Sequence, residues 1–201
     1  MFIYDDNFLT EEEIIEIDKN YFSPEKSWTY FPGTQSEPGY EYKFEEGNSM
    51  VDFPVKDVAY FSCFQIGNTE GMKYNHKVSP IFTSLIDKFC KKHKIEYSKV
   101  IRMKFNMTLR SDYDSHMYPH VDDMNDHYVF LYYVNDSDGD TFVFNEKAEL
   151  SKKFEYKDLT LMKRITPKKG AAILMDGKHF HAISAPTKTN LRCVINVNLQ
   201  Y

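Results

Sequence analysis

A histidine and an aspartate two residues apart form the part of the sequence best suited to chemistry. They are His120 and Asp122, in the segment Tyr118-Pro119-His120-Val121-Asp122. Side chains of an extended chain alternate between two faces, so this imidazole and this carboxylate point the same way and can bind one metal ion. Such tripeptides are frequent by chance, so the pair alone is weak evidence for a metal site. A metal site also needs a third ligand from elsewhere in the chain.

Two later histidines could supply that third ligand. His179 and His181 lie in the segment 178–186, and their equal parity on a strand gives them the same face. Two imidazoles and one carboxylate on one side of a metal ion are the ligand set of non-haem Fe(II) sites, which keep the opposite positions open. From the residues alone, either histidine can complete the set.

The residues around these ligands have the period of β-strands. From about residue 98 to 110, Met103 and Phe105 alternate with Arg102 and Lys104, which is the clearest strand pattern in the chain. Further strands are predicted at 127–135, 140–145, 160–166, 171–175, 179–184 and 191–200, separated by turn residues. Many short strands that follow two early helices predict a sandwich or jelly roll, with the helices backing one sheet.

The two helices are predicted from their start signals. A short strand within residues 2–9 leads to Thr10 and Glu13, which can form a capping box and predict a helix over about 10–20. Ser79 and Pro80 open a second helix, with serine as the N-cap and proline at the first helical position. The intervening residues 21–70 are rich in aromatics. We expect an excursion packed on the core, rather than a loop that covers a binding cleft.

The last strand carries a charge that requires explanation. Cys193 and Ile195 face one way on this strand, whereas Arg192, Asn196 and Asn198 face the other. If helices cover the apolar face, the arginine points into the interior between the strands. A buried guanidinium is costly unless it meets an anion, so Arg192 predicts an anionic ligand.

Bulk properties narrow the class of protein. The chain has 201 residues and a formal net charge of −5, which argues against broad binding to a nucleic-acid backbone. Cys63, Cys90 and Cys193 are scattered and odd in number, so no disulfide framework is expected and a cytoplasmic setting fits best. We expect no secretory signal at the N-terminus and no membrane-spanning helix.

The sequence resembles the 2-oxoglutarate- and Fe(II)-dependent oxygenases, within the prolyl 4-hydroxylase-like group, over about residues 100–200. His120 and Asp122 match the family's His-x-Asp pair. The segment 132–135 matches a strand with the consensus Tyr-Leu-Asn, and 138–142 resembles the Gly-Gly-Glu-Thr-x-Phe turn and strand. The segment 170–175 resembles the strand before the last histidine ligand, and His181-Ala182 with Pro186 resembles the distal His–Pro motif.

The resemblance implies a mainly β fold, a double-stranded β-helix with Fe(II) at one mouth. We expect one domain over 1–201, with an N-terminal elaboration at 1–97 and a β-helix core at 98–201. Family spacing to Arg192 favours His181 over His179 as the distal ligand, beside His120 and Asp122. Arg192 would bind the far carboxylate of 2-oxoglutarate with help from Tyr133 or Thr141. O2 would be the second cosubstrate.

The resemblance also bears on the substrate. Because the ligand carboxylate Asp122 is present, hydroxylation is expected rather than halogenation. Asp138 replaces the first glycine of the Gly-Gly pair, which weakens the case for a prolyl substrate. A peptide side chain or a small molecule is expected, and DNA-repair relatives carry a second arginine that this chain lacks. Substrate or outer-shell contacts are expected from the following residues: Lys104, Asn106, Asp123 and His179.

Two other functions compete with this one. A jelly-roll protein could keep the fold and use the site for binding or sensing alone. Another mononuclear metal enzyme, such as a zinc hydrolase or a cupin-type isomerase, could use the same three ligands. Neither alternative requires an inward arginine after the last ligand, and Arg192 therefore favours the oxygenase.

Overall fold

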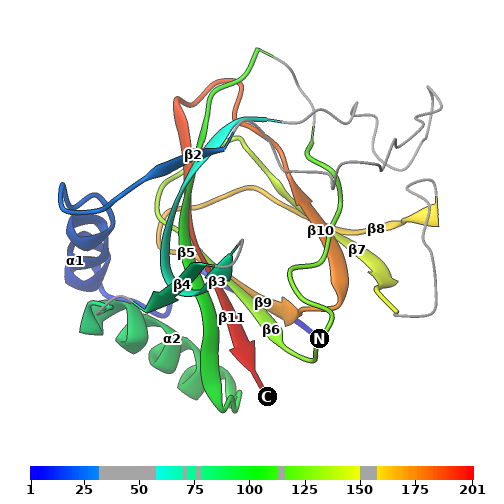
Figure 1. Ribbon diagram of the computed structural model, residues 1–201, viewed down its shortest axis with the longest axis horizontal. Helices are drawn as coiled ribbons and strands as arrows, with labels where there is room; N and C mark the ends of the chain where they lie inside the picture. Colours follow the sequence, from blue (N-terminus) through cyan, green and yellow to red (C-terminus); the bar gives the residue numbers. More distant parts are fainter. Residues whose placement is uncertain (32–57, 70–71, 76–77, 113–115, 150–157) are drawn as a thin grey trace.

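The structure is a computed structural model that describes residues 1–31, 58–69, 72–75, 78–112, 116–149 and 158–201. Within these residues the chain is mainly β, with antiparallel sheets and two helices (Figure 1). The elements are β1 Phe2–Asp5, α1 Glu11–Tyr21, β2 Thr29–Phe31, β3 Tyr60–Thr69, β4 Met72–Asn75, α2 Pro80–His93, β5 Lys99–Leu109, β6 Tyr128–Tyr133, β7 Thr141–Lys147, β8 Leu161–Ile165, β9 Ala172–Asp176, β10 His179–Ile183 and β11 Leu191–Gln200. Neither of the described helices is long and apolar enough to cross a lipid bilayer.

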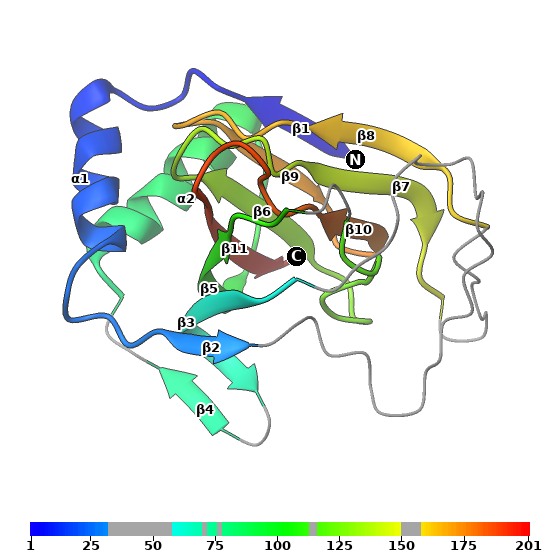
Figure 2. The ribbon, with the colours of Figure 1, turned by 90° about the horizontal axis from the view of Figure 1, so that it is seen from above.

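The strands form a large and a small antiparallel sheet. The large sheet has the order β1-β9-β6-β11-β5-β3-β2, with β4 on β3, and the small sheet has the order β10-β7-β8. Figures 1 and 2 show the two sheets facing each other, with the helices on the far side of the large sheet. Val129 and Val194 of the large sheet pack with Val143 and Ile165 of the small one, and these residues form the core between the sheets.

The outer face of the large sheet binds the helices. Tyr21 of α1 stacks on Phe105 of β5 at 5.1 Å between ring centroids, and Phe82 of α2 contacts the same ring at 4.7 Å. Cys193 and Ile195 of β11 belong to this same core. The odd-numbered residues of β5 and β11 therefore face the helices, and the even-numbered residues face the small sheet.

Both helices start where their sequence signals predict. At α1, Thr10 Oγ1 accepts a hydrogen bond from Glu13 N, and Glu13 accepts one from Thr10 N, so the predicted capping box is confirmed. At α2, Ser79 is the N-cap and Pro80 lies in the first turn, as predicted. The Ser79 hydroxyl makes no capping hydrogen bond, and the Ser79 carbonyl accepts a hydrogen bond from Phe82 N at 3.0 Å.

Strand positions from residue 98 onward agree with the alternation in the sequence. The seven predicted strands correspond to β5 to β11, with ends displaced by one to a few residues. The strand β3 was not predicted, and it lies within the segment 21–70. Ser62 and Gln65 of β3 are buried although they are polar, so the strand shows no clear alternation of apolar and polar residues. The strand β2 of the same segment was not predicted either, and Trp28 packs against the core beneath the helices as expected. Residues 32–57 of the segment lie outside the described residues.

Candidate metal centre

Three side chains converge between the two sheets. His120 and Asp122 lie in the connection from β5 to β6, and His181 lies on β10. One potential ligand atom from each of the three lies within 4.8 Å of the others. A short antiparallel bridge fixes this arrangement, because His120 N donates to His181 O at 3.0 Å and His181 N donates to His120 O at 2.9 Å. The sequence-predicted pair thus meets a histidine from the opposite sheet.

Backbone carbonyls orient both imidazoles. His120 Nδ1 lies 3.1 Å from Tyr118 O, and His181 Nδ1 lies 3.2 Å from His179 O. A carbonyl only accepts, so each Nδ1 carries the proton, and each Nε2 keeps its lone pair free. This is the tautomer that a histidine ligand needs, with its second nitrogen held by a hydrogen bond.

Burial keeps the two imidazoles neutral. It lowers the pKa of His120, and it lowers the pKa of His181 to about 4, with the neighbouring His120 adding to the effect. Attraction by Asp122 only partly opposes the shift in each case. Both histidines are therefore unprotonated near pH 7, as metal ligands must be.

The Asp122 carboxylate is buried and points its two oxygens in different directions. Its side chain is 2% exposed, whereas that of His120 is 42% exposed. Oδ1 lies 3.9 Å from His120 Nε2, and Oδ2 pairs with Arg102 Nη2 and accepts a hydrogen bond from Asn196 Nδ2 at 3.3 Å. Burial alone would raise the pKa of Asp122, but the nearby cations, Arg102 foremost, hold it well below its usual range. The carboxylate is thus ionised, with Oδ1 available on the histidine side.

His179 does not join this group, although it has the same parity as His181. Its Nδ1 lies 2.8 Å from Phe144 O, so its ring faces β7. The pairing of β10 with β7 changes register between His179 and His181. This irregularity breaks the strict alternation on which the equal-face argument depends, and it separates the two rings.

A second polar group surrounds Arg192 of β11. The guanidinium is 1% exposed, with Nε donating to Gly139 O at 2.8 Å and Nη2 donating to Thr141 Oγ1 at 2.7 Å. Tyr133 OH donates to the same threonine oxygen at 3.0 Å, and burial raises the pKa of Tyr133 to about 12. The structure therefore brings the three residues predicted for the cosubstrate into contact with one another.

Arg192 has no carboxylate partner among the described residues. The acidic side chain nearest in sequence to its contacts, Asp140, pairs with Arg164 Nε at 2.5 Å instead. On the same face, the Thr108 hydroxyl opposite Arg192 on β5 is buried and makes no hydrogen bond within the described part of the chain. A buried cation beside an unsatisfied hydroxyl is a site for an anion that also accepts hydrogen bonds.

The turn before β7 holds this arginine in place. A Cβ on Gly139 would lie 2.8 Å from Ser184 O, 2.9 Å from Pro186 N and 3.0 Å from Arg192 Cδ, so only glycine fits. The adjacent Asp138 carboxylate accepts hydrogen bonds from both the backbone and the hydroxyl of Thr187. Asp138, which stands where the resembled family has the first glycine of its Gly-Gly pair, therefore connects two loops.

The residues predicted to touch substrate are distributed unevenly. Asn106 Oδ1 accepts a hydrogen bond from Ser62 Oγ at 2.8 Å, and its side chain is thus held within the large sheet. Asp123 Oδ1 accepts from Asn125 N and Nδ2 at 2.8 Å, in a local turn. Lys104 lies opposite Asn196 on β11, and Asn196 contacts Asp122.

Sequence reasoning missed the partners of the carboxylate. Neither Arg102 nor Asn196 was assigned a role beside Asp122. Their parity on the predicted strands placed both on the inward face, which was the available signal. The missing information was the pairing of β5 with β11, which puts Arg102 opposite Asn198 and Lys104 opposite Asn196.

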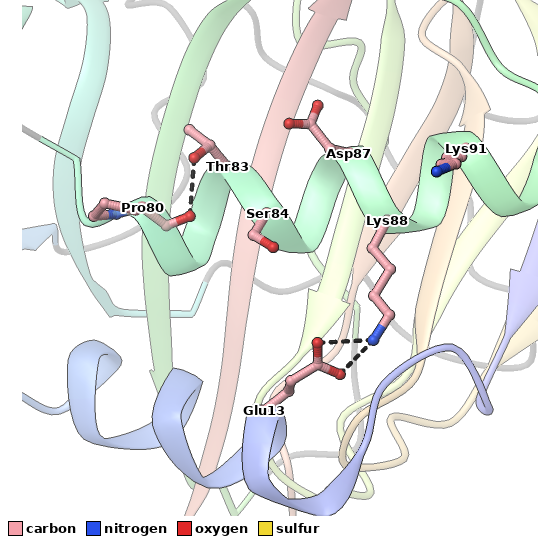
Figure 3. Close-up of a pocket in the computed structure, with 7 residues that line it drawn as sticks. All are labelled: Glu13, Pro80, Thr83, Ser84, Asp87, Lys88 and Lys91. Carbon is pink, nitrogen blue, oxygen red and sulfur yellow. Dashed lines mark hydrogen bonds and ion pairs between the residues drawn. The ribbon is translucent and has the colours of Figure 1, made fainter.

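A groove between the helices is unrelated to this centre (Figure 3). It is lined by Glu13 of α1 and by Pro80, Thr83, Ser84, Asp87, Lys88 and Lys91 of α2. An ion pair at 2.6 Å between Lys88 Nζ and Glu13 Oε2 crosses it. Since the large sheet separates the helices from the small sheet, the groove lies on the opposite side from the inward-facing ligands (Figure 1).

The fold was compared with known proteins. No family model and no curated protein matches the sequence. An oxidoreductase of the 2OG-Fe(II) oxygenase family from Burkholderia pseudomallei matches the structure with a TM-score of 0.63 at 12% identity, covering 99% of this chain and 84% of that one. A Trichoplax adhaerens prolyl hydroxylase in complex with a hypoxia-inducible factor peptide gives 0.51 at 13% identity, covering 99% and 83%.

A third structure belongs to the same chemical class. The non-haem α-ketoglutarate-dependent epimerase SnoN from nogalamycin biosynthesis matches with a TM-score of 0.60 at 10% identity, covering 99% of this chain and 78% of that one. Identities this low establish a shared fold, whereas the reactions and substrates belong to those proteins. At the level of fold, the resemblance of this chain to the 2-oxoglutarate/Fe(II) oxygenases is confirmed.

Proposed function

We propose that the protein is an Fe(II)- and 2-oxoglutarate-dependent dioxygenase that hydroxylates a peptide side chain or a small molecule. The observation that carries this proposal is the pairing of two features on one inward face. One is the group His120, Asp122 and His181, and the other is the buried Arg192, which has no carboxylate partner among the described residues. A metal-ligand group alone would suit many enzymes. A metal-ligand group with a buried cation nearby suits an enzyme that uses both a metal ion and an anionic cosubstrate.

The donor set fits Fe(II). Two neutral imidazoles with free Nε2 atoms and one ionised carboxylate are the ligands of the facial triad. Arg102 and Asn196 hold Asp122 Oδ2, which leaves Oδ1 for a single bond to the metal. The exposure of His120 gives the centre access to solvent, and thus to substrate. His120, Asp122 and His181 would hold the ion.

The surroundings of Arg192 fit the far carboxylate of 2-oxoglutarate. The guanidinium can bind a carboxylate through two parallel hydrogen bonds, and Thr141 and Tyr133 supply hydroxyls beside it. Bound together, iron and 2-oxoglutarate supply O2 activation, with decarboxylation to succinate and CO2 coupled to oxidation of the substrate. The chain's own part is to orient the carboxylate, exclude water around Arg192, and hold the ligands unprotonated.

The finer features of the fold belong to the same proposal. The two facing sheets support a double-stranded β-helix over 98–201, with residues 1–97 as an elaboration within one domain and the helices backing the large sheet. The free cysteines Cys63, Cys90 and Cys193 are all buried. Three unpaired thiols support a reducing, cytoplasmic setting.

Anaerobic titration of Fe(II) and 2-oxoglutarate into the protein tests the proposal. A weak visible charge-transfer band is expected, together with succinate formation when O2 is admitted. His120→Ala and Asp122→Ala should lose both signals, whereas His179→Gln should keep the band, because its ring faces β7. Circular dichroism establishes that each variant is folded.

The competing functions give different outcomes. Metal binding without a 2-oxoglutarate-dependent band, and without succinate, would identify a different metal enzyme. A folded protein that binds neither metal nor 2-oxoglutarate would exclude both enzymes and leave the binding module. Product analysis on a stimulating substrate separates hydroxylation from other oxidations, which matters because one protein of the same fold is described as an epimerase.

A further inference from the structure

The inward face of β5 and β11 carries cations at two separate places. Across this strand pair, Arg192 lies opposite Thr108, and Lys104 lies opposite Asn196. The two positions are four residues apart along each strand, which is about 13 Å at the usual rise per residue. The second place is completed by Arg102, two residues from Lys104 on the same face. Asp122, which contacts Asn196, lies at this second place and not at Arg192.

The charges at this second place do not balance. Arg102 and Lys104 bring two positive charges, and Asp122 brings one negative charge, which Arg102 already pairs with. Lys104 Nζ makes no hydrogen bond or ion pair within the described part of the chain. Arg102 Nε is buried and also lacks an acceptor among the described residues. Arg102 Nη2 also donates to Asn198 Oδ1 at 3.2 Å, so the donors without an acceptor among the described residues are Lys104 Nζ and Arg102 Nε.

The environment of Lys104 is electrostatically unfavourable for a cation. Burial and the charge of Arg102 lower the pKa of Lys104 to about 8, and Asp122 only partly offsets them. A divalent ion at the neighbouring ligands would add more positive charge. Lys104 is only partly exposed, and an anion from outside the chain would supply the acceptor that this cation lacks among the described residues.

We propose that Lys104 and Arg102 bind an anionic group of the substrate, a carboxylate or a phosphate, beside the metal centre. This proposal rests on the proposed function, because there both carboxylates of 2-oxoglutarate are already accounted for, one at Arg192 and one at the metal. The substrate would then be an acidic small molecule whose oxidised carbon lies a few bonds from its anionic group. The negative charge fixes its orientation over the exposed His120 side of the centre.

The site can be tested without iron or turnover. Inorganic phosphate and acetate are titrated into the metal-free protein, and backbone amide shifts are followed by NMR. We expect saturable shifts at residues 102–106, separable from any shifts at 190–193 that report on Arg192. Lys104→Gln should weaken the anion affinity measured from the shifts at residues 102–106 about tenfold or more, because one charge-assisted hydrogen bond is lost. Lys104→Arg should keep the affinity within about threefold, because it retains the charge.

Lys99→Gln is the matched control, since Lys99 is an exposed lysine at the start of the same strand. It should bind both anions as the wild type does. Equal anion affinity in folded Lys104→Gln, or shifts near 190–193 alone, would overturn the proposal. Binding of phosphate but not acetate, or the reverse, assigns the anion as phosphate or carboxylate.

A second experiment uses turnover. Succinate release is measured with matched pools of carboxylates, phosphates and their uncharged amides or alcohols. Stimulation by the anionic pools, with a higher KM in Lys104→Gln and recovery in Lys104→Arg, is expected. Stimulation by the uncharged pool alone overturns the proposal. No succinate under any condition, with Lys104-dependent anion shifts intact, contradicts the oxygenase function and leaves the anion site standing.

Discussion

The Asp138 carboxylate joins two loops beside Arg192. Oδ2 accepts from Thr187 N, Thr187 Oγ1 and Lys188 N, and Oδ1 accepts from the backbone and hydroxyl of Thr189. Burial raises the pKa of Asp138, but these hydrogen bonds, those of Thr189 first, lower it far more. A single side chain therefore fixes the loop before β11, which carries the arginine.

Asp138→Asn should lower the free energy of unfolding by about 1–3 kcal/mol at pH 7, because an amide cannot accept all five hydrogen bonds. The folded pKa of Asp138 lies below its unfolded value, so its contribution is complete above about pH 4 and declines as the pH falls towards the folded pKa. Urea unfolding at pH 7 and pH 3 measures both values. A difference between variant and wild type that does not shrink at pH 3 contradicts this account.

Arg192→Lys tests the proposed role of this single residue in binding the far carboxylate of 2-oxoglutarate. A lysine keeps the charge but cannot form two parallel hydrogen bonds to a carboxylate. We expect the affinity for 2-oxoglutarate to fall about tenfold or more, with Fe(II) affinity unchanged because the ligands are separate. Anaerobic titration of the charge-transfer band measures both affinities. Unchanged 2-oxoglutarate affinity would falsify the assignment of Arg192.

At the scale of elements, the turn between β6 and β7 and the strand β11 act as one unit. Gly139 lies in this turn, its carbonyl accepts from Arg192 Nε, and the loop around Pro186 packs against its α-carbon. The helices contribute from the other face of the sheet, where Tyr21 OH donates to Asn106 O at 2.6 Å. The turn thus positions Arg192 directly, whereas the helix contact stabilises the other face of the large sheet.

Gly139→Ala should therefore disturb the site through the backbone. Its Cβ would press on Ser184 O and Pro186 N, and backbone atoms cannot move away cheaply. We expect a loss of about 1–3 kcal/mol in the free energy of unfolding and a weaker affinity for 2-oxoglutarate. Tyr21→Phe is the comparison, because it should reduce stability by removing one buried hydrogen bond while leaving ligand affinity unchanged. Equal ligand affinity in both variants contradicts the role of the turn.

For the whole molecule, the candidate metal ligands come from both sheets. His120 and Asp122 belong to the connection beyond β5 of the large sheet, and His181 belongs to β10 of the small one. An ion held by all three would stabilise only the folded state, because the unfolded chain does not bring the ligands together. The proposed metal centre therefore predicts that metal binding raises the stability of the protein.

Mn(II), used as a redox-stable substitute for Fe(II), should raise the free energy of unfolding by about 2.7 kcal/mol at a concentration 100 times its Kd. Because the pKa of His181 is lowered to about 4 and that of His120 is also lowered, affinity should decline at a lower pH than ligation by ordinary imidazoles would give. Thermal unfolding at several pH values measures this. Loss of the stabilisation near pH 6.5, where ordinary imidazoles titrate, contradicts the neutral-histidine assignment.

The sequence by itself determined the features that depend on local periodicity. Alternation placed the strands from residue 98 onward, and it put Arg192 on the face opposite Cys193. The spacing of His120 and Asp122 identified a two-ligand unit for the same reason. These features need no knowledge of which strand lies beside which.

The tertiary structure alone decided the features that depend on strand pairing. The register shift in β10 places His181 beside His120 and turns His179 towards β7. The pairing of β5 with β11 puts Arg102 opposite Asn198 and Lys104 opposite Asn196, and Asn196 contacts Asp122. Pairing and bulges arise from contacts between residues far apart in sequence, so periodicity within one segment cannot encode them.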